Sequence, residues 1–424
     1  MIKILSIFFL ISLTSCSYLI DSYEKDVLKT NNIVPKDLTE NTTCQIIQKN
    51  ILINESKGSQ EDFESFIKNV SRDHILKFID KVVLWSLMQI NIRPDLNSPT
   101  AKLQVLLHLN GQEKYYNAYL EQGLGFPYFY LLEHLLTTYK SRYSLIELTA
   151  IYDQNMKSNF KVTSGFANFL ESKKSSLTKH SIFEKTYLRG DETLKKSERI
   201  PKVTLTGFVK HYLKNKKKNN YELKEFLFSY KENSSFVPKC NFDMNLYDNS
   251  IFLINKKKVQ GNVFGLKERE NAFMAISSQL ISEIKPLLNS SLLEGSSNSR
   301  SAALCMFKDR FKPQSNLWLI SSDSRDPGQH LYHLLKYGIE DVKQVSEIDQ
   351  MLKFSRHLFL KNPVRLIIES RRSDQKQIEE LLKLNIPVYN AKSLGKIWGY
   401  FKNDNQASFI LDARQPGELS CNSL

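Results

Sequence analysis

The chain has 424 residues, of which 59 are Lys or Arg and 45 are Asp or Glu, so its formal net charge is +14. Hydrophobic residues make up 41% of the chain, with 15 glycines and 12 prolines, a composition that excludes disordered, collagen-like and other low-complexity proteins. The length suits two or three packed domains, and the positive charge favours anionic partners.

The first sixteen residues carry the most specific pattern. Lys3 precedes an uncharged, mostly apolar run that ends in Leu13-Thr14-Ser15-Cys16. Such a run suits a secretory signal and is too short for a spanning helix, which needs roughly 20 apolar residues. The pattern resembles a bacterial lipoprotein signal peptide with its lipobox. The resemblance implies cleavage before Cys16, acylation of Cys16, and a lipid-anchored protein of the cell envelope. In a cell with two membranes it implies the outer membrane, facing the periplasm or the cell surface.

The expected partners follow from that location. The membrane is bound through the lipidated Cys16, and an anionic envelope component or a protein is a further candidate, whereas nucleic acid is disfavoured outside the cytoplasm. No nucleotide loop, dinucleotide fingerprint or metal-ligand spacing occurs, so we expect no cofactor and no metal. An exported protein can form disulfides, and the pairing of the four remaining cysteines is left open by the sequence. These are Cys44, Cys240, Cys305 and Cys421.

The first half of the mature chain predicts helices. Residues 1–15 form the signal, residues 16–58 a polar lipidated tether, and residues 59–235 a helical domain. Phe63 and Val70 belong to one apolar helical face. The further helix signals are the apolar run 75–92, Ser98-Pro99 as a start, Gly111 and Gly123 as ends, the capping box Ser144–Glu147, and aromatic faces at 128–139 and 221–230.

Residues 240–424 alternate between short apolar runs and helical patterns. This alternation predicts a three-layer α/β domain with a mainly parallel sheet, so the fold class expected for the whole chain is α + α/β. The predicted strands are 251–254, 302–306, 317–321, 364–369, 386–389 and 408–411. The predicted helices are 266–288, 327–337, 347–354, 374–384 and 393–401.

One polar segment lies where a predicted strand, 317–321, meets a helix that begins at Asp326-Pro327. Open α/β sheets bind ligands at such junctions, where the helix N-terminus offers free N–H groups. The candidate catalytic residues are Asp323, Asp326, His330 and His333, and the candidate anion-binding residues are Ser324 and Arg325. The alternative is a capped helix that carries a half-buried histidine.

A fainter resemblance concerns the last hundred residues. The segments 317–322, 363–369 and 380–389 are similar to the strands and helices of a phospholipase D-like half. Lys396 matches the lysine of that family's HxK motif, but Leu394 stands where the family has its nucleophilic histidine. The resemblance therefore implies an inactive relative.

We expect from these patterns a non-enzymatic, membrane-anchored envelope lipoprotein with a binding or scaffold role. The alternative is an envelope hydrolase whose site is the segment 323–333, or a degenerate phosphodiesterase-like domain. Convergence of the four candidate catalytic side chains in one open pocket would favour the hydrolase. A helix face turned to the core would favour the binding or scaffold role.

Overall fold

The computed structural model describes residues 51–54, 59–120, 125–157, 160–177, 185–227, 239–244, 247, 259–280, 302–308, 316–361, 364–369, 372–373, 375–383, 386–404, 407–412, 414 and 418–420. The predicted signal peptide with Cys16, Cys44, Cys421 and the predicted strand 251–254 lie outside these residues. No helix within the described ranges is both long and apolar enough to cross a membrane.

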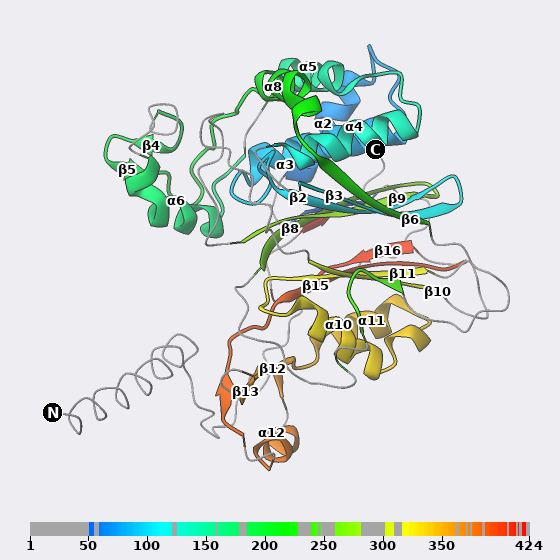
Figure 1. The fold of residues 1–424 in the computed structure, drawn as a ribbon, viewed down its shortest axis with the longest axis vertical. Helices are drawn as coiled ribbons and strands as arrows, with labels where there is room; N and C mark the ends of the chain where they lie inside the picture. Colours follow the sequence, from blue (N-terminus) through cyan, green and yellow to red (C-terminus); the bar gives the residue numbers. More distant parts are fainter. Residues whose placement is uncertain are drawn as a thin grey trace.

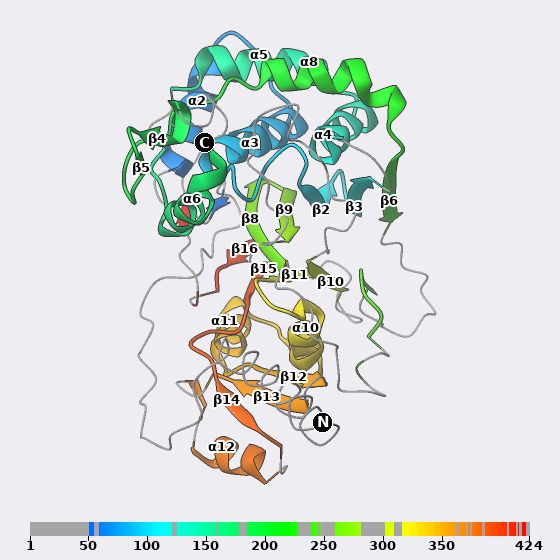
Figure 2. The same cartoon turned by 60° about the vertical axis from the view of Figure 1, so that its left-hand side comes forward.

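Two antiparallel sheets lie face to face, and helices cover their outer surfaces (Figures 1 and 2). The larger sheet contains, in spatial order, β17 (Glu418–Ser420), β1 (Ile51–Asn54), β8 (Val259–Glu268), β9 (Asn271–Leu280), β2 (Lys102–Leu109), β3 (Gln112–Leu120) and β6 (Tyr221–Leu227). The smaller sheet contains β16 (Ala407–Ile410), β15 (Lys396–Lys402), β11 (Asn316–Ser322), β10 (Ala303–Lys308) and β7 (Lys239–Cys240).

The helices form the two outer layers. Above the larger sheet lie α2 (Ser59–Val70), α3 (Phe78–Ile92), α4 (Pro127–Thr138), α5 (Leu145–Asn155) and α8 (Thr206–Asn215), which continues into η1 (Lys216–Lys218). Beside them lie α6 (Ser164–Leu177) and the hairpin of β4 (Leu188–Arg189) and β5 (Glu192–Thr193). Below the smaller sheet lie α10 (Pro327–Lys336), η3 (Ile339–Asp341) and α11 (Val345–Lys353). A three-stranded sheet of β12 (His357–Lys361), β13 (Val364–Ile368) and β14 (Val388–Asn390) follows, with α12 (Gln375–Leu382) at the end of the molecule.

The central strands of both large sheets are buried on both faces, and alternate residues along such a strand pack into different cores. In β2, Val105 and Leu107 pack toward the helices, whereas Leu106 packs between the two sheets. In β11, Trp318 and Ile320 face the space between the sheets, and their neighbours face α10 and α11. The residues of each core are therefore brought together from segments far apart in the chain.

The expectation of a mainly parallel sheet was wrong. In the described structure β13 and β14 are the parallel pair, and the other paired strands are antiparallel. A strand buried on both faces is a continuous apolar run, which looks the same in parallel and antiparallel sheets. Of the predicted helix 266–288, residues 266–280 instead belong to the β8–β9 hairpin, whose turn places Arg269 at φ +52°, and the remainder lies outside the described residues. The predicted helix 393–401 is largely β15.

The region expected to be purely helical also contributes strands to the larger sheet. The expected helix start at Ser98-Pro99 is followed by β2, and Gly111, the expected helix end, lies in the turn between β2 and β3. The aromatic run from Tyr221 forms β6. In the larger sheet β9 pairs with β2, so strands from the two sides of the boundary expected at 235–240 are neighbours. That boundary does not divide the sheet.

Several local predictions are confirmed. Helices α2 and α3 form where the apolar periodicity predicted them, and Ser144 and Glu147 make the predicted capping box at the start of α5. Helix α10 begins as predicted, with Asp326 as its N-cap and Pro327 in its first turn. Of the cysteines in the described ranges, Cys240 and Cys305 form a disulfide between the paired strands β7 and β10.

Candidate functional site

The polar segment after β11 lies between the two-sheet core and the lower helices. Asp326 accepts a hydrogen bond from the backbone N–H of Gln329 at 3.4 Å, and it accepts another from the hydroxyl of Tyr247 at 2.7 Å. Gln329 in turn pairs with the backbone of Phe359 in β12, through bonds of 2.7 and 3.3 Å. Asp326 is therefore a helix cap, and the hydrogen bonds of Asp326 and Gln329 connect α10 to Tyr247 and to β12.

Asp323 takes part in an ion pair at the common end of β8, β11 and β15. Its backbone has φ +55°, and its carboxylate lies 3.1 Å from Nζ of Lys396, which is 1% exposed. The same carboxylate accepts a bond of 3.3 Å from the N–H of Gly261, and Lys396 donates to the carbonyl of Gly261. Asp323 thus ties the two large sheets together.

Ser324 and His330 form a buried pair on the other side of this junction. Oγ of Ser324 lies 2.8 Å from Nε2 of His330, and it accepts a bond of 3.2 Å from the N–H of Asp326. Gly395 lies directly against the pair: a Cβ there would be 3.2 Å from each side chain and 2.8 Å from the carbonyl of Ser322. With φ +65° as well, this position requires glycine.

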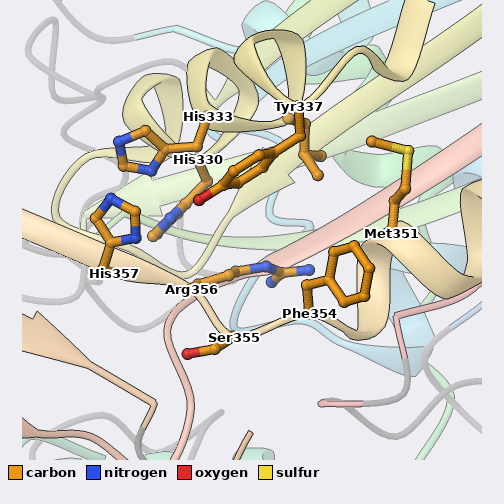
Figure 3. Close-up of a pocket in the computed structure, with 9 residues that line it drawn as sticks. His330, His333, Tyr337, Met351, Phe354, Ser355, Arg356 and His357 are labelled. Carbon is orange, nitrogen blue, oxygen red and sulfur yellow. The ribbon is translucent and has the colours of Figure 1, made fainter. Parts of the chain in front are cut away.

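A pocket opens beside His330, between α10, α11 and the start of β12 (Figure 3). Its cavity volume is about 20 Å³, room for about one water molecule. The lining residues are His330, His333, Leu334, Tyr337, Met351, Phe354, Ser355, Arg356 and His357. In Figure 3 the three histidines gather at one end, and Met351 and Phe354 lie at the other. The side chain of Arg356 lies between them and its guanidinium points toward Phe354, so both ends of the cavity carry polar groups.

The three histidines are held uncharged. His333 and His357 stack with their ring centroids 4.0 Å apart. Burial, together with the neighbouring His357, lowers the pKa of His333 to about 3. Burial lowers the pKa of His357 to about 4. Burial, followed by the charge of Arg356, holds the pKa of His330 well below its usual value. At neutral pH these rings are hydrogen-bonding groups rather than cations.

A buried network of ion pairs lies beside the pocket and includes Arg356 of its lining. Arg356 lies 2.7 Å from Asp412, and Arg414 lies 2.6 Å from Glu369 and 3.3 Å from Asp412. Burial lowers the pKa of Arg356 to about 10. Burial alone would raise the pKa of Asp412, but the two guanidinium groups and two backbone N–H groups hold it below its usual value. Each charge in the network therefore has an opposite partner.

The predicted site residues divide between these places. His330 and His333 line the pocket. Asp323 instead binds Lys396, and Asp326 caps α10. Ser324 contacts His330 behind the pocket wall, and Arg325 is half-exposed and does not line the pocket. The four candidate catalytic side chains do not converge in one pocket. Within the described ranges, no group of three or more His, Cys, Asp or Glu side chains is placed to hold a metal ion.

Sequence reasoning missed the wall of the pocket opposite α10. Its residues are Met351, Phe354, Arg356 and His357, which come from α11, β12 and the residues beside them and belong to no motif. Tyr337, at the end of α10, was missed as well. In the sequence, the phospholipase D resemblance alone draws attention to Lys396. Only the contacts between elements identify the residues of this wall.

No protein-family model matches the chain, and no curated protein matches it. Its shape does match solved structures. Two structures of a protein called LmbA2991 align with TM-scores of 0.63 and 0.62 at 9% identity, over 90% of this chain and 99% of theirs. The crystal structure of cephalosporin acylase from Bacillus halodurans aligns with a TM-score of 0.60 at 8% identity, over 93% of this chain and 99% of that one. At this identity the likeness is one of fold.

The likeness corrects the expected function. A non-enzymatic binding or scaffold protein was expected, but the fold of nine-tenths of the chain is one that an acylase has. The terms lipoprotein and membrane receive no support from these matches, and neither does the phospholipase D resemblance. The lipidation of Cys16, which lies outside the described residues, stays a prediction.

Proposed function

We propose that this protein is a hydrolase of the acylase type, which cleaves the amide bond between an acyl group and an amine. The observation that carries the proposal is the arrangement of two facing antiparallel sheets between helical layers, which the chain shares over 93% of its length with a cephalosporin acylase. Because one fold can host several chemistries, the proposal also needs a reaction centre and a direct test.

Ser324 and His330 are the proposed reaction centre. Their 2.8 Å contact is the nucleophile–base distance that acyl transfer needs. His330 lines the pocket, and Ser324, which is 4% exposed, lies directly behind it. Ser324 Oγ attacks the carbonyl carbon while His330 takes its proton, and that proton then passes to the leaving nitrogen as the C–N bond breaks. Water next attacks the acyl-serine and gives one proton to His330. The proton returns to Ser324 as the carboxylic acid leaves.

The electrostatics of His330 suit the transfer of its proton to the leaving group. Burial and the charge of Arg356 hold its pKa well below the usual value, so the ring is neutral over the physiological range and is a weaker base than an ordinary histidine. The protonated ring is then a strong acid, which favours transfer to a leaving amine. Activity should therefore persist well below pH 6.5, where an ordinary histidine base becomes protonated.

The test measures kcat/KM of the full-length protein on acyl p-nitroanilides with alkyl and aryl acyl groups and on an acylated cephalosporin. Ser324→Ala and His330→Phe should each lower kcat/KM by roughly 10²–10⁴-fold, the usual contribution of a nucleophile or base. The matched controls are Ser172→Ala and His211→Ala, at exposed positions on α6 and α8, and both should keep wild-type activity.

Two results would contradict the proposal at different levels. Failure of the wild-type protein to hydrolyse any of these amides would contradict the acylase function. Hydrolysis that survives both Ser324→Ala and His330→Phe would contradict the assigned residues. Loss of that residual activity in Lys396→Met would then move the centre to the Asp323–Lys396 ion pair.

A further inference from the structure

Helix α8 and its continuation η1 carry a cluster of exposed lysines at one end of the molecule. In Figures 1 and 2, α8 lies with α5 along the outermost edge of the upper helical layer, at the end opposite α12. Lys210 and Lys214 are about one helical turn apart on α8, and Lys217 and Lys218 follow in η1. All four side chains are exposed, whereas Tyr212 on the inner side of α8 is buried. We call these four lysines the lysine face.

The charge of the lysine face is not balanced within the described part of the protein. Residues 206–220 contain five lysines and no Asp, Glu or Arg. Glu133 contacts this segment but binds Tyr212 and Lys216, and Asp153 contacts it as the cap at the start of α8. No lysine of the face makes an ion pair or a hydrogen bond with a described residue. Like charges at this spacing weaken a helix, so the fold alone gains nothing from their concentration here.

The side chains of this segment suit a diffuse anionic surface. An ammonium group is a point charge, whereas a phosphopeptide or a base edge is usually bound through the planar fork of an arginine. Single-stranded nucleic acid needs exposed aromatic rings on which bases stack, but Phe208 is partly buried and Tyr212 fully buried. The phosphates of a lipid surface form no fixed pattern, and each lysine close to such a surface strengthens the attraction by roughly fivefold.

We propose that the lysine face docks the protein on the surface of a membrane that contains anionic lipids. In this orientation α8 and η1 lie against the lipid phosphates, and the lower helices α10, α11 and α12 point away from the membrane. The inference depends neither on the proposed hydrolysis nor on the predicted acylation of Cys16. An acyl chain on Cys16 would hold the protein at the same surface but would not choose which face meets it.

The experiment measures how the full-length protein partitions onto phosphatidylcholine vesicles, with and without phosphatidylglycerol as about a third of the lipid. The wild-type protein should prefer the anionic vesicles by at least about tenfold, and about 0.5 M NaCl should remove the preference by screening. Replacement of all four lysines of the face by glutamine should reduce the preference to about twofold or less. The matched control removes the same charge from exposed positions elsewhere and should keep the preference. Its residues are Lys68, Lys343, Lys376 and Lys383, each changed to glutamine.

Labelling of lysines with acetic anhydride measures the orientation of the wild-type protein independently. On anionic vesicles the lysine face should react several-fold more slowly than on neutral ones, whereas the four control lysines should react equally on both. An equal loss of preference in the two variants, or equal labelling of the two sets, would overturn the docking face, because net charge alone would then explain binding. Tighter binding to soluble dextran sulfate than to anionic vesicles, at equal charge concentration, would overturn the membrane as the partner.

Discussion

At the scale of single residues, the histidines of the pocket combine burial with loss of charge. The stacked rings of His333 and His357 have pKa values of about 3 and about 4, against about 6.5 for an ordinary histidine. Two imidazolium groups in that stack would repel each other and would lose their hydration. The folded protein therefore excludes protons that the unfolded chain binds.

This exclusion predicts a loss of stability in mild acid. A folded-state pKa below the unfolded value gives stability that is complete above pH 6.5 and is lost as the pH falls toward 4. Between pH 7 and pH 5 each ring contributes a loss of at most about 2 kcal/mol. Urea unfolding of His333→Gln/His357→Gln should show a smaller decrease over this interval than the wild-type protein. His211→Gln, at an exposed position, is the control, and an unchanged decrease in the double variant would contradict the prediction.

At the scale of elements, two hairpin turns determine which strands are neighbours in the larger sheet. The β2–β3 hairpin turns at Asn110 and Gly111, with φ +53° and +75°, and this Asn-Gly pair is the strongest short-range hairpin signal. The β8–β9 turn instead uses Arg269, which gives no such signal. The Asn-Gly pair could therefore have predicted the β2–β3 hairpin, although we expected Gly111 to end a helix.

Gly111→Ala should destabilise the protein by about 1–2 kcal/mol, because a Cβ disfavours the left-handed backbone although no atom lies within 4 Å of it. The matched control is Gly207→Ala in α8, which also has open space but no positive φ, and which should be neutral or stabilising by up to about 1 kcal/mol. Chemical unfolding of both variants measures the difference. Equal effects would mean that backbone conformation does not determine this turn.

At the scale of the whole molecule, the larger sheet unites the two halves of the chain. Strand β8 lies between β1 and β9, and β9 lies between β8 and β2, so strands from after the expected boundary at 235–240 lie between strands from before it. The disulfide between Cys240 and Cys305 adds a covalent link on the smaller sheet. Neither half of the chain contains a complete sheet core.

A fragment of residues 59–235 should therefore not fold alone, because removal of β8 and β9 exposes the edge of β2 and the apolar residues beneath α3. We expect it to show no cooperative thermal transition, whereas the full chain does. Proteolytic cleavage between residues 230 and 248 should leave two fragments that co-elute in size-exclusion chromatography. A soluble, cooperatively unfolding fragment 59–235 would contradict this view of the fold.

The sequence by itself determined the local features of this protein. Helices α2 and α3, the capping box of Ser144 and the start of α10 at Asp326 were predictable, because each depends on residues within a few positions of one another. The position of His330 and His333 on one helix was predictable for the same reason. The lipobox, which ends at Cys16, is also local, and its prediction is independent of the fold.

Only the tertiary structure decided strand direction, sheet partners and the pocket. The central strands are buried on both faces, so their apolar runs are the same whether a neighbouring strand is parallel or antiparallel. The sequence left the cysteine pairing open, and the register of β7 against β10 places Cys240 opposite Cys305, where they form a disulfide. His357 and Arg356 reach His330 through packing of β12 on α10, a contact between separate elements, and such contacts depend on the whole fold rather than on local pattern.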